Sequence, residues 1–167
     1  MTTPSCDQLP YQLTWDMFAG DWNRYKDALY SIFKRDLIDN PPAFRGKPVD
    51  IIHEQFFENK ERSFWHIISN GDHDDNRSPN EERCAGVSWV KPLIEDTRVC
   101  EHYAVWVKWH DKTKRDRYYI WCKYVDYLVI LEDRKTHYKL ITAYPVQYSK
   151  KQLEKDYSKY LKTKSPT

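Results

Sequence analysis

The sequence predicts an α+β fold in which N-terminal helices precede an antiparallel four-stranded meander sheet and a C-terminal helix. Near the N-terminus, apolar residues recur every three or four positions, which is the period of one helical face. Residues 103–146 then form strand-like runs in direct succession, and residues 149–161 return to helical spacing. Helices followed by consecutive strands indicate helices packed against one face of an antiparallel sheet.

The length of 167 residues is typical of a single domain covering residues 1–167. We expect its parts to be an irregular segment over 1–13, a helix over 14–39, a core over 47–148 and a basic helical tail over 149–164. The 7 Trp and 13 Tyr residues supply enough apolar area to fill such a core.

The first helix is expected to begin after Thr14, a good N-cap residue, and to run to about Asp39. Its predicted buried face consists of Trp15, Phe18, Trp22, Tyr25, Leu29, Ile32 and Phe33. The prolines after Asn40 stop the helix, and Gly20 is the position at which it would divide.

The segment 43–62 is mixed, with a short strand predicted over 49–53, and the apolar run 63–69 predicts a second strand. Residues 70–80 read as a polar loop. A helix should follow from Glu81, capped by Asn80 or Ser78, and Pro92 predicts a kink or an end near Lys91.

Four strands are expected over 104–109, 118–124, 127–131 and 138–144. The first two alternate polar and apolar residues, whereas 127–131 is continuously apolar and therefore suits an inner strand covered on both faces. The tail helix is expected to pack through Leu153, Tyr157 and Leu161.

Several functional classes lack their sequence signals. There is no signal peptide and no apolar run long enough to span a membrane, so we expect a cytoplasmic protein. The four cysteines form no CxxC pair, which disfavours structural zinc and a disulfide framework. The Walker, GxGxxG, GxSxG and HExxH motifs are all missing from the sequence, and no cofactor is expected.

Positive charge gathers in two places although the net charge is only +2. Residues 149–164 carry six lysines, among them Lys150, Lys151 and Lys155, and the turn 112–117 carries four more basic residues. Such patches can meet phosphate groups, although a solvated face is the more common role of a charge run.

His66 is the leading candidate for acid–base chemistry, because it lies inside an apolar run that would fix its backbone. A hydrogen-bonded structural histidine is the alternative. Arg83 occupies the first turn of the predicted helix, where a cation opposes the helix dipole, so an anionic partner is one explanation.

Hydroxyl groups on the last strand form a second candidate group. Side-chain alternation would place Thr142 and Tyr144 on one face with Tyr138 and Leu140, where they could contact phosphate oxygens. Ordinary strand propensity explains the same residue types.

A metal site is the rival chemistry. His53-Glu54, the acidic cluster 72–75, and Asp126 with the Asp133–Lys135 segment offer hard ligands. Their spacing matches no metal motif, and a cluster in a loop is poorly preorganised.

Three segments together resemble the barnase–EndoU–colicin–RelE type of small ribonuclease found in phages and plasmids. They are Arg62–Ser69, Arg83–Ile94, and Asp126–Lys135 running on to Leu140–Pro145. The resemblance covers about residues 47–148. It implies a helical part before a four-stranded antiparallel sheet, and RNA cleavage without a metal through attack of the ribose 2′-hydroxyl.

The resemblance also implies roles for individual residues. His66 matches the catalytic histidine, Arg83 and Arg134 would hold the phosphate, and Thr142 with Tyr144 would complete the pocket. Tyr138 and the tail lysines Lys150, Lys151 and Lys155 are then expected to bind the RNA chain. A second histidine is not evident, and His102 and His137 are only candidates.

Three functions follow from these observations. The first is an endoribonuclease, in the manner of a toxin controlled by an inhibitory partner protein. The second is a non-catalytic module that binds nucleic acid or protein, and the third is a metal-dependent nuclease.

Overall fold

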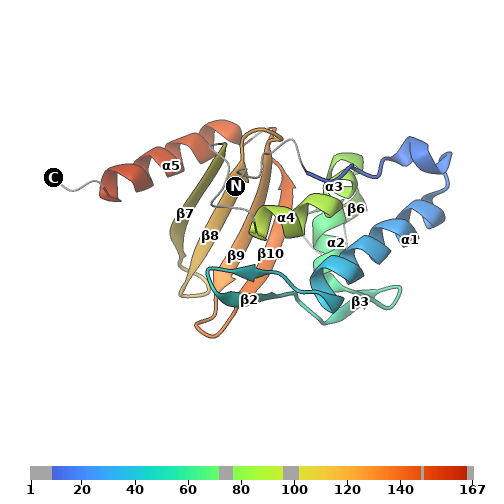
Figure 1. Ribbon diagram of the computed structural model, residues 1–167, viewed down its shortest axis with the longest axis horizontal. Coiled ribbons are helices and arrows are strands. Elements are labelled where there is room, and N and C mark those ends of the chain that lie inside the picture. The colour runs from blue at the N-terminus through green and yellow to red at the C-terminus, as the bar shows by residue number, and fades with distance from the viewer. Residues whose placement is uncertain (1–8, 72–76, 96–101, 148, 165–167) are drawn as a thin grey trace, which may run out of the picture.

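A central sheet with helices on both sides organises the computed structural model, which describes residues 9–71, 77–95, 102–147 and 149–164 (Figure 1). The helices are α1 (Trp22–Phe33), α2 (Arg62–Ile68), α3 (Glu81–Ala85), α4 (Val90–Glu95) and α5 (Lys150–Lys164). The strands are β1 (Ala43–Phe44), β2 (Lys47–Asp50), β3 (Gln55–Phe57), β4 (Lys60–Glu61), β5 (Ser69–Asn70), β6 (Ser78–Pro79), β7 (Tyr103–His110), β8 (Arg115–Cys122), β9 (Tyr127–Asp133) and β10 (Tyr138–Pro145). The predicted α+β class and the C-terminal helix are confirmed.

The main sheet is mixed, with six strands among the described residues in the order β1-β2-β10-β9-β8-β7. Strands β7 to β10 form the expected antiparallel meander, but β2 adds to β10 in parallel, with Val49 opposite Tyr138. The prediction of a four-stranded, purely antiparallel sheet was therefore wrong in detail. A four-residue strand that contains a proline carries too weak a signal to reveal a partner so far along the chain.

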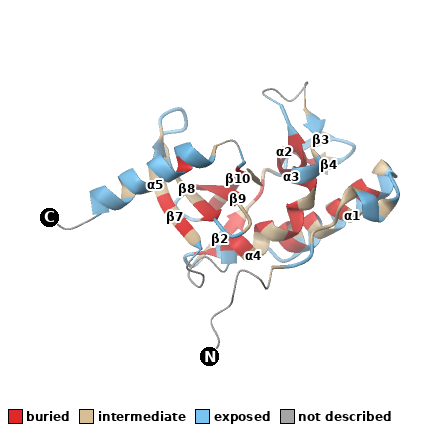
Figure 2. Ribbon diagram, turned by 90° about the horizontal axis from the view of Figure 1, so that it is seen from above, coloured by how far each residue is buried: buried red, intermediate tan, exposed pale blue. Residues whose placement is uncertain are grey.

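Both faces of the sheet are covered. Tyr127, Val129 and Leu131 of β9 face the core under α1, α2 and α4, whereas Leu128 and Ile130 face a second core under α5. This explains the continuous apolar run and confirms β9 as an inner strand. The expectation of helices on one face only was wrong. In Figure 2 the buried residues gather on the sheet and on the inner sides of the helices, while α5 is mostly exposed.

The predicted first helix is divided where Gly20 was expected to divide it. A single 3₁₀ turn, Trp15–Phe18, ends at Ala19 and Gly20, which have φ values of 51° and 77°. The second part, α1, is capped by Asp21, whose carboxylate accepts a hydrogen bond from the backbone N–H of Arg24. It continues as a π-helix over Lys34–Asp39, and Thr14 makes no side-chain cap.

The apolar run 63–69 forms helix α2, so the strand predicted there was wrong. Phe64, Trp65, Ile67 and Ile68 are all buried against the sheet and α1. A short, fully buried apolar run has no periodicity that distinguishes a helix from a strand. The consequence for the site is that His66 projects from a helix instead of from a strand.

Helix α3 begins as predicted, with the Asn80 side chain accepting a hydrogen bond from the backbone N–H of Arg83 at 3.0 Å. The break comes at Gly86 and not near Lys91. A Cβ atom at Gly86 would lie 2.3 Å from the Tyr127 ring, so the close approach of β9 requires a glycine here. Pro92 is tolerated in the first turn of α4, where its missing N–H would have had no helical partner.

The tail helix α5 packs on the sheet through Leu153, and Tyr157 lies against Trp106 with ring centroids 5.6 Å apart. Leu161 is 46% exposed, so the prediction that it packs was wrong, because α5 extends beyond the edge of the sheet (Figure 1). Within the described ranges, no helix has both the length and the apolar character of a membrane span.

Candidate functional site

The candidate site lies along the second half of β10. Strand β2 pairs with β10 only at Tyr138 and Lys139, and beyond that point helices α2 and α3 pack beside the strand (Figure 1). Helices that cover a sheet edge are a common way of protecting its backbone groups. Here they bring side chains from two helices up to a single strand.

His66 projects from α2 toward this edge and is hydrogen-bonded to the backbone of Ile141. Burial lowers the pKa of His66 to about 4, and the positive charges of Arg77, Arg62 and Arg83 lower it further. The imidazole is therefore neutral at pH 7 and able to accept a proton.

Arginine side chains surround His66. The Arg83 Nη1 donates to the backbone oxygen of His66 at 2.8 Å, and its guanidinium lies 5.1 Å from the centre of the Tyr144 ring. Burial lowers the pKa of Arg83 from its usual range, although the group stays charged. Arg77 donates to the backbone oxygen of Ser69 at 3.1 Å, and Arg62 pairs with Glu54 at 3.0 Å.

A β-bulge sets the direction of the last-strand hydroxyls. The register shifts between Leu140 and Thr142, so Thr142 lies opposite Ile130 and Tyr144 opposite Leu128. Thr142 and Tyr144 therefore share a face, as expected. That face is not shared with Tyr138 and Leu140, because the extra residue reverses the alternation.

A small cavity of about 230 Å³ adjoins Arg83 and Tyr144. It is lined by Asn70, Asn80, Glu82, Arg83, Tyr144, Pro145, Gln147 and Ser149. The Arg83 guanidinium, the Tyr144 phenol and the amide groups can hold a phosphate-sized anion in a space of this size, whereas the Glu82 carboxylate opposes one. Together, the structure brings His66, Arg83 and Tyr144 to one edge, with Thr142 on the same strand segment.

Arg134 lies at the other end of β10 and is not part of this cluster. Its Nε donates to the Glu132 carboxylate at 2.8 Å, and Arg117 holds the same carboxylate at 2.9 Å. With about 3.3 Å per strand residue, the β9–β10 turn lies roughly 20 Å from Tyr144. The predicted role of Arg134 as a phosphate clamp at the site of His66 was therefore wrong.

The expected RNA-binding residues are dispersed. Tyr138 is buried against Phe44 and Tyr118, so it has no surface to offer to a substrate. Lys150 is 3.4 Å from Asp126 and follows the cavity residue Ser149. Lys151 and Lys155 are exposed on α5, which leads away from the site (Figure 1).

Arg77 and Arg62 are the site residues that sequence reasoning missed. Arg77 lies in a segment that read as a plain polar loop, and no local pattern marks it. A helical assignment of 62–68 would have been the useful signal, because residues four apart in a helix, such as Arg62 and His66, lie on the same face one turn apart.

The candidate metal ligands do not gather among the described residues, which contain no group of three or more ligating side chains. His53 is 2.6 Å from Asp50, and Glu54 pairs with Arg62. Asp133 pairs with Lys47 at 2.9 Å. The acidic cluster 72–75 lies outside the described residues, as do Cys6 and Cys100, whereas Cys84 and Cys122 are buried free thiols.

Comparison with protein-family models, with curated proteins and with solved structures finds no match to this chain.

Proposed function

We propose that the protein is a metal-independent endoribonuclease whose site is the edge of β10 between α2 and α3. The observation that carries the proposal is the convergence of His66, Arg77, Arg83 and Tyr144 at this edge. Arginine side chains beside a neutral imidazole suit an anionic substrate that must lose a proton. RNA is the partner that this chemistry requires, and an inhibitory protein partner would act by covering the same edge.

The reaction would begin when His66 takes the proton of a ribose 2′-hydroxyl. The 2′-oxygen then forms a bond to the adjacent phosphorus, and the bond from phosphorus to the 5′-oxygen breaks. Arg77 and Arg83 would stabilise the charge that builds up on the phosphorane oxygens. The products are a 2′,3′-cyclic phosphate and a free 5′-hydroxyl.

Tyr144 is the proposed proton donor to the leaving 5′-oxygen. Burial raises the pKa of Tyr144, and nearby Tyr119 raises it further, so the phenol is protonated at neutral pH. Arg83 lies over the face of its ring and offsets part of this shift. A bound phosphate would in turn raise the pKa of His66, because its negative charge opposes the arginines.

The direct test is RNA cleavage by the purified full chain in EDTA. We expect products with 2′,3′-cyclic phosphate ends, and we expect His66→Ala to reduce the rate about 10²- to 10⁴-fold, the usual loss for a positioned acid or base. Its thermal midpoint should stay close to that of the unsubstituted protein. His110→Ala, a substitution in the β7–β8 hairpin, is the matched control and should cleave normally.

Two results would contradict the proposal. Full activity of His66→Ala would remove the proposed base. Activity that disappears on chelation and returns with Mg²⁺ would instead support a metal-dependent nuclease.

The low pKa of His66 favours a second candidate, a module that binds RNA without cleaving it, since a group with a pKa of about 4 is a weak base. Binding without turnover on several RNAs would support this candidate. If the lysines of α5 take part, Lys151→Gln with Lys155→Gln should reduce the slope of log affinity against log salt by about 1 for each lost phosphate contact. An unchanged slope would mean that these lysines are only a solvated face.

A further inference from the structure

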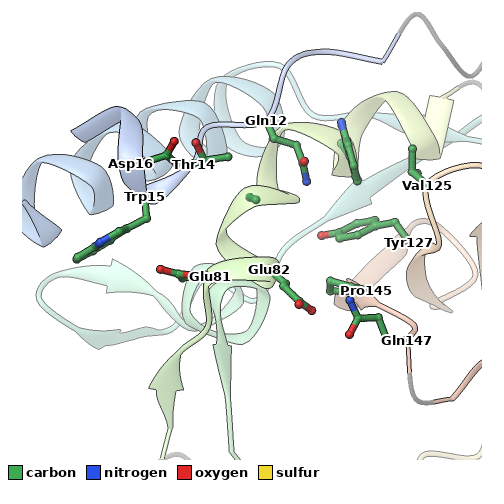
Figure 3. A pocket seen from close by; sticks show the side chains of 12 residues that line it. Gln12, Thr14, Trp15, Asp16, Glu81, Glu82, Val125, Tyr127, Pro145 and Gln147 are labelled. Atoms are coloured by element: carbon green, nitrogen blue, oxygen red, sulfur yellow. The ribbon is translucent and has the colours of Figure 1, made fainter. Parts of the chain in front are cut away.

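A second and larger cavity, of about 640 Å³, adjoins the first at Glu82, Pro145 and Gln147 (Figure 3). The N-terminal 3₁₀ turn, the first turn of α3, and the residues that begin β9 and follow β10 form its walls. The lining residues are Gln12, Thr14, Trp15, Asp16, Glu81, Glu82, Ala85, Trp89, Val125, Tyr127, Pro145 and Gln147. Unlike the site beside His66, it contains no arginine or lysine among these residues.

Three carboxylates give this cavity its charge. Among the residues that the structure describes, Glu81 and Glu82 have no ion-pair partner, and Asp16 accepts a hydrogen bond from Thr14. Acidic residues in the first turn of a helix stabilise its N-terminus, which by itself would account for Glu81 and Glu82. Evidence for a ligand must therefore come from another group.

Tyr127 supplies that evidence. Its side chain is only 1% exposed, and its hydroxyl has no hydrogen-bond partner among the described residues. Figure 3 shows the hydroxyl end of the ring directed into the cavity. Leaving a buried hydroxyl unpaired costs on the order of 1–3 kcal/mol, so a bound donor would satisfy a group that the protein itself leaves unsatisfied.

Aromatic rings complete the lining. The ring of Trp89 meets Tyr127 edge to face, with centroids 5.8 Å apart, and its indole N–H donates to the backbone oxygen of Pro10 at 3.0 Å. Trp15 closes the opposite side of the cavity. Carboxylates beside fixed aromatic faces attract organic cations through both charge and the ring quadrupole.

Arg83 does not cancel this negative charge from within the cavity. Although it follows Glu82 directly, its guanidinium reaches toward the His66 backbone and the Tyr144 ring. Of the three charged residues in this turn of α3, Glu81 lines the larger cavity and not the smaller one, Arg83 lines the smaller one and not the larger, and Glu82 lines both.

We propose that this cavity binds an organic cation with a guanidinium or primary ammonium group, carried by a small amine or by a side chain of a basic peptide. The cation would lie against the rings of Trp15 and Trp89, pair with Glu81 and Glu82, and donate to the Tyr127 hydroxyl. This proposal does not rest on RNA cleavage at β10, because the groups that would hold the cation are not the proposed catalytic residues.

The test measures the binding of cationic probes to the purified full chain at low salt, with tryptophan fluorescence and calorimetry as the two readouts. The probes are agmatine, a blocked arginine tripeptide, and the same peptide with citrulline, which keeps the shape and removes the charge. We expect saturable binding of the arginine peptide, at least about fivefold tighter than the citrulline peptide. If agmatine also binds, the cationic group alone is sufficient for binding. If only the arginine peptide binds, the natural ligand is an arginine side chain of a protein or peptide.

Two variants localise the binding. Glu81→Gln with Glu82→Gln should weaken it about tenfold, the effect of losing a charged partner. Tyr127→Phe should weaken it severalfold without lowering the thermal midpoint, since only an unpaired hydroxyl is removed. Glu154→Gln, an exposed substitution on α5, is the matched control.

The proposal is overturned if neither cation binds saturably below about 10 mM. Equal binding of the citrulline peptide, or an unchanged affinity in the double glutamate variant, would also overturn it. So would binding of guanosine monophosphate in place of the cations, because the cavity would then be a nucleotide site.

Discussion

Arginine side chains lie at both ends of β10, but the groups that accept their hydrogen bonds differ. At the turn before the strand, Arg117 and Arg134 share the carboxylate of Glu132, which is completely buried. At the other end, Arg77 and Arg83 donate to the backbone oxygens of Ser69 and His66, beside a neutral imidazole. The first arrangement stabilises the fold, and the second is able to receive an anion.

The comparison shows that two arginine-rich regions act differently on the titratable group beside them. Burial alone would raise the pKa of Glu132, but Arg117, Thr113 and Arg134 lower it below its usual range. At the other end, burial lowers the pKa of His66, and the positive charges of Arg77, Arg62 and Arg83 lower it further. The same residue type therefore has a structural role at one end and the proposed catalytic role at the other.

The largest effect on stability is expected at the turn end. Glu132→Gln should lower the free energy of unfolding by about 3–5 kcal/mol, because two arginines lose a buried counter-charge. Glu54→Gln, which removes the exposed partner of Arg62, should cost about 1 kcal/mol or less. Urea unfolding of both variants measures the difference, and similar losses would show that the two ends are electrostatically alike.

Activity should respond in the opposite order. Arg83→Gln should reduce kcat/KM for RNA about 10²- to 10³-fold, the usual loss of a charge-stabilising donor. Arg134→Gln should leave kcat/KM of the folded fraction within about twofold while lowering the unfolding midpoint. If Arg134→Gln lost as much activity as Arg83→Gln, the turn end would have to belong to the site.

The sheet could be predicted in large part from the sequence because its signals are local. Alternation, a continuous apolar run and charged turns define β7 to β10, and the cap of α3 follows from Asn80. The parallel addition of β2 could not be predicted, since a contact between Val49 and Tyr138 leaves no local trace. The class of fold was therefore predictable, whereas the composition of the sheet edge was not.

The candidate site was predictable only in part for the same reason. His66, Arg83 and Tyr144 were identified by residue type, and the structure brings them together. Arg134 was wrongly assigned to the site of His66, because the sequence of a turn does not indicate at which end of the strand the helices pack. The prediction that Tyr138 shares a sheet face with Thr142 and Tyr144 was wrong, because a β-bulge reverses the side-chain alternation along β10. The sequence contains no signal for this bulge.

The smallest expected effect is on the pH dependence of stability, and it tests whether burial and the nearby arginines lower the pKa of His66 in the folded protein. The unfolded imidazole has a pKa of about 6.5, whereas the folded one has a pKa of about 4. Above pH 6.5 the group is neutral in both states. As pH falls from 6.5 to 4, the unfolded chain binds a proton that the folded protein rejects, so stability decreases over this window.

At pH 4.5 this loss should amount to about 2 kcal/mol relative to pH 7, after an allowance for the partial exposure of the ring. His66→Gln should remove that part of the acid sensitivity, so urea unfolding at the two pH values should show a smaller decrease in the variant. His110→Gln controls for the loss of an imidazole elsewhere. Stabilisation by the Glu132 carboxylate is instead lost at lower pH, as the pH falls from about 4.5 through its lowered folded pKa. Equal decreases for His66→Gln and the unsubstituted protein would mean that the pKa of His66 is not lowered in the folded protein, and the contrast between the two ends of β10 would not hold.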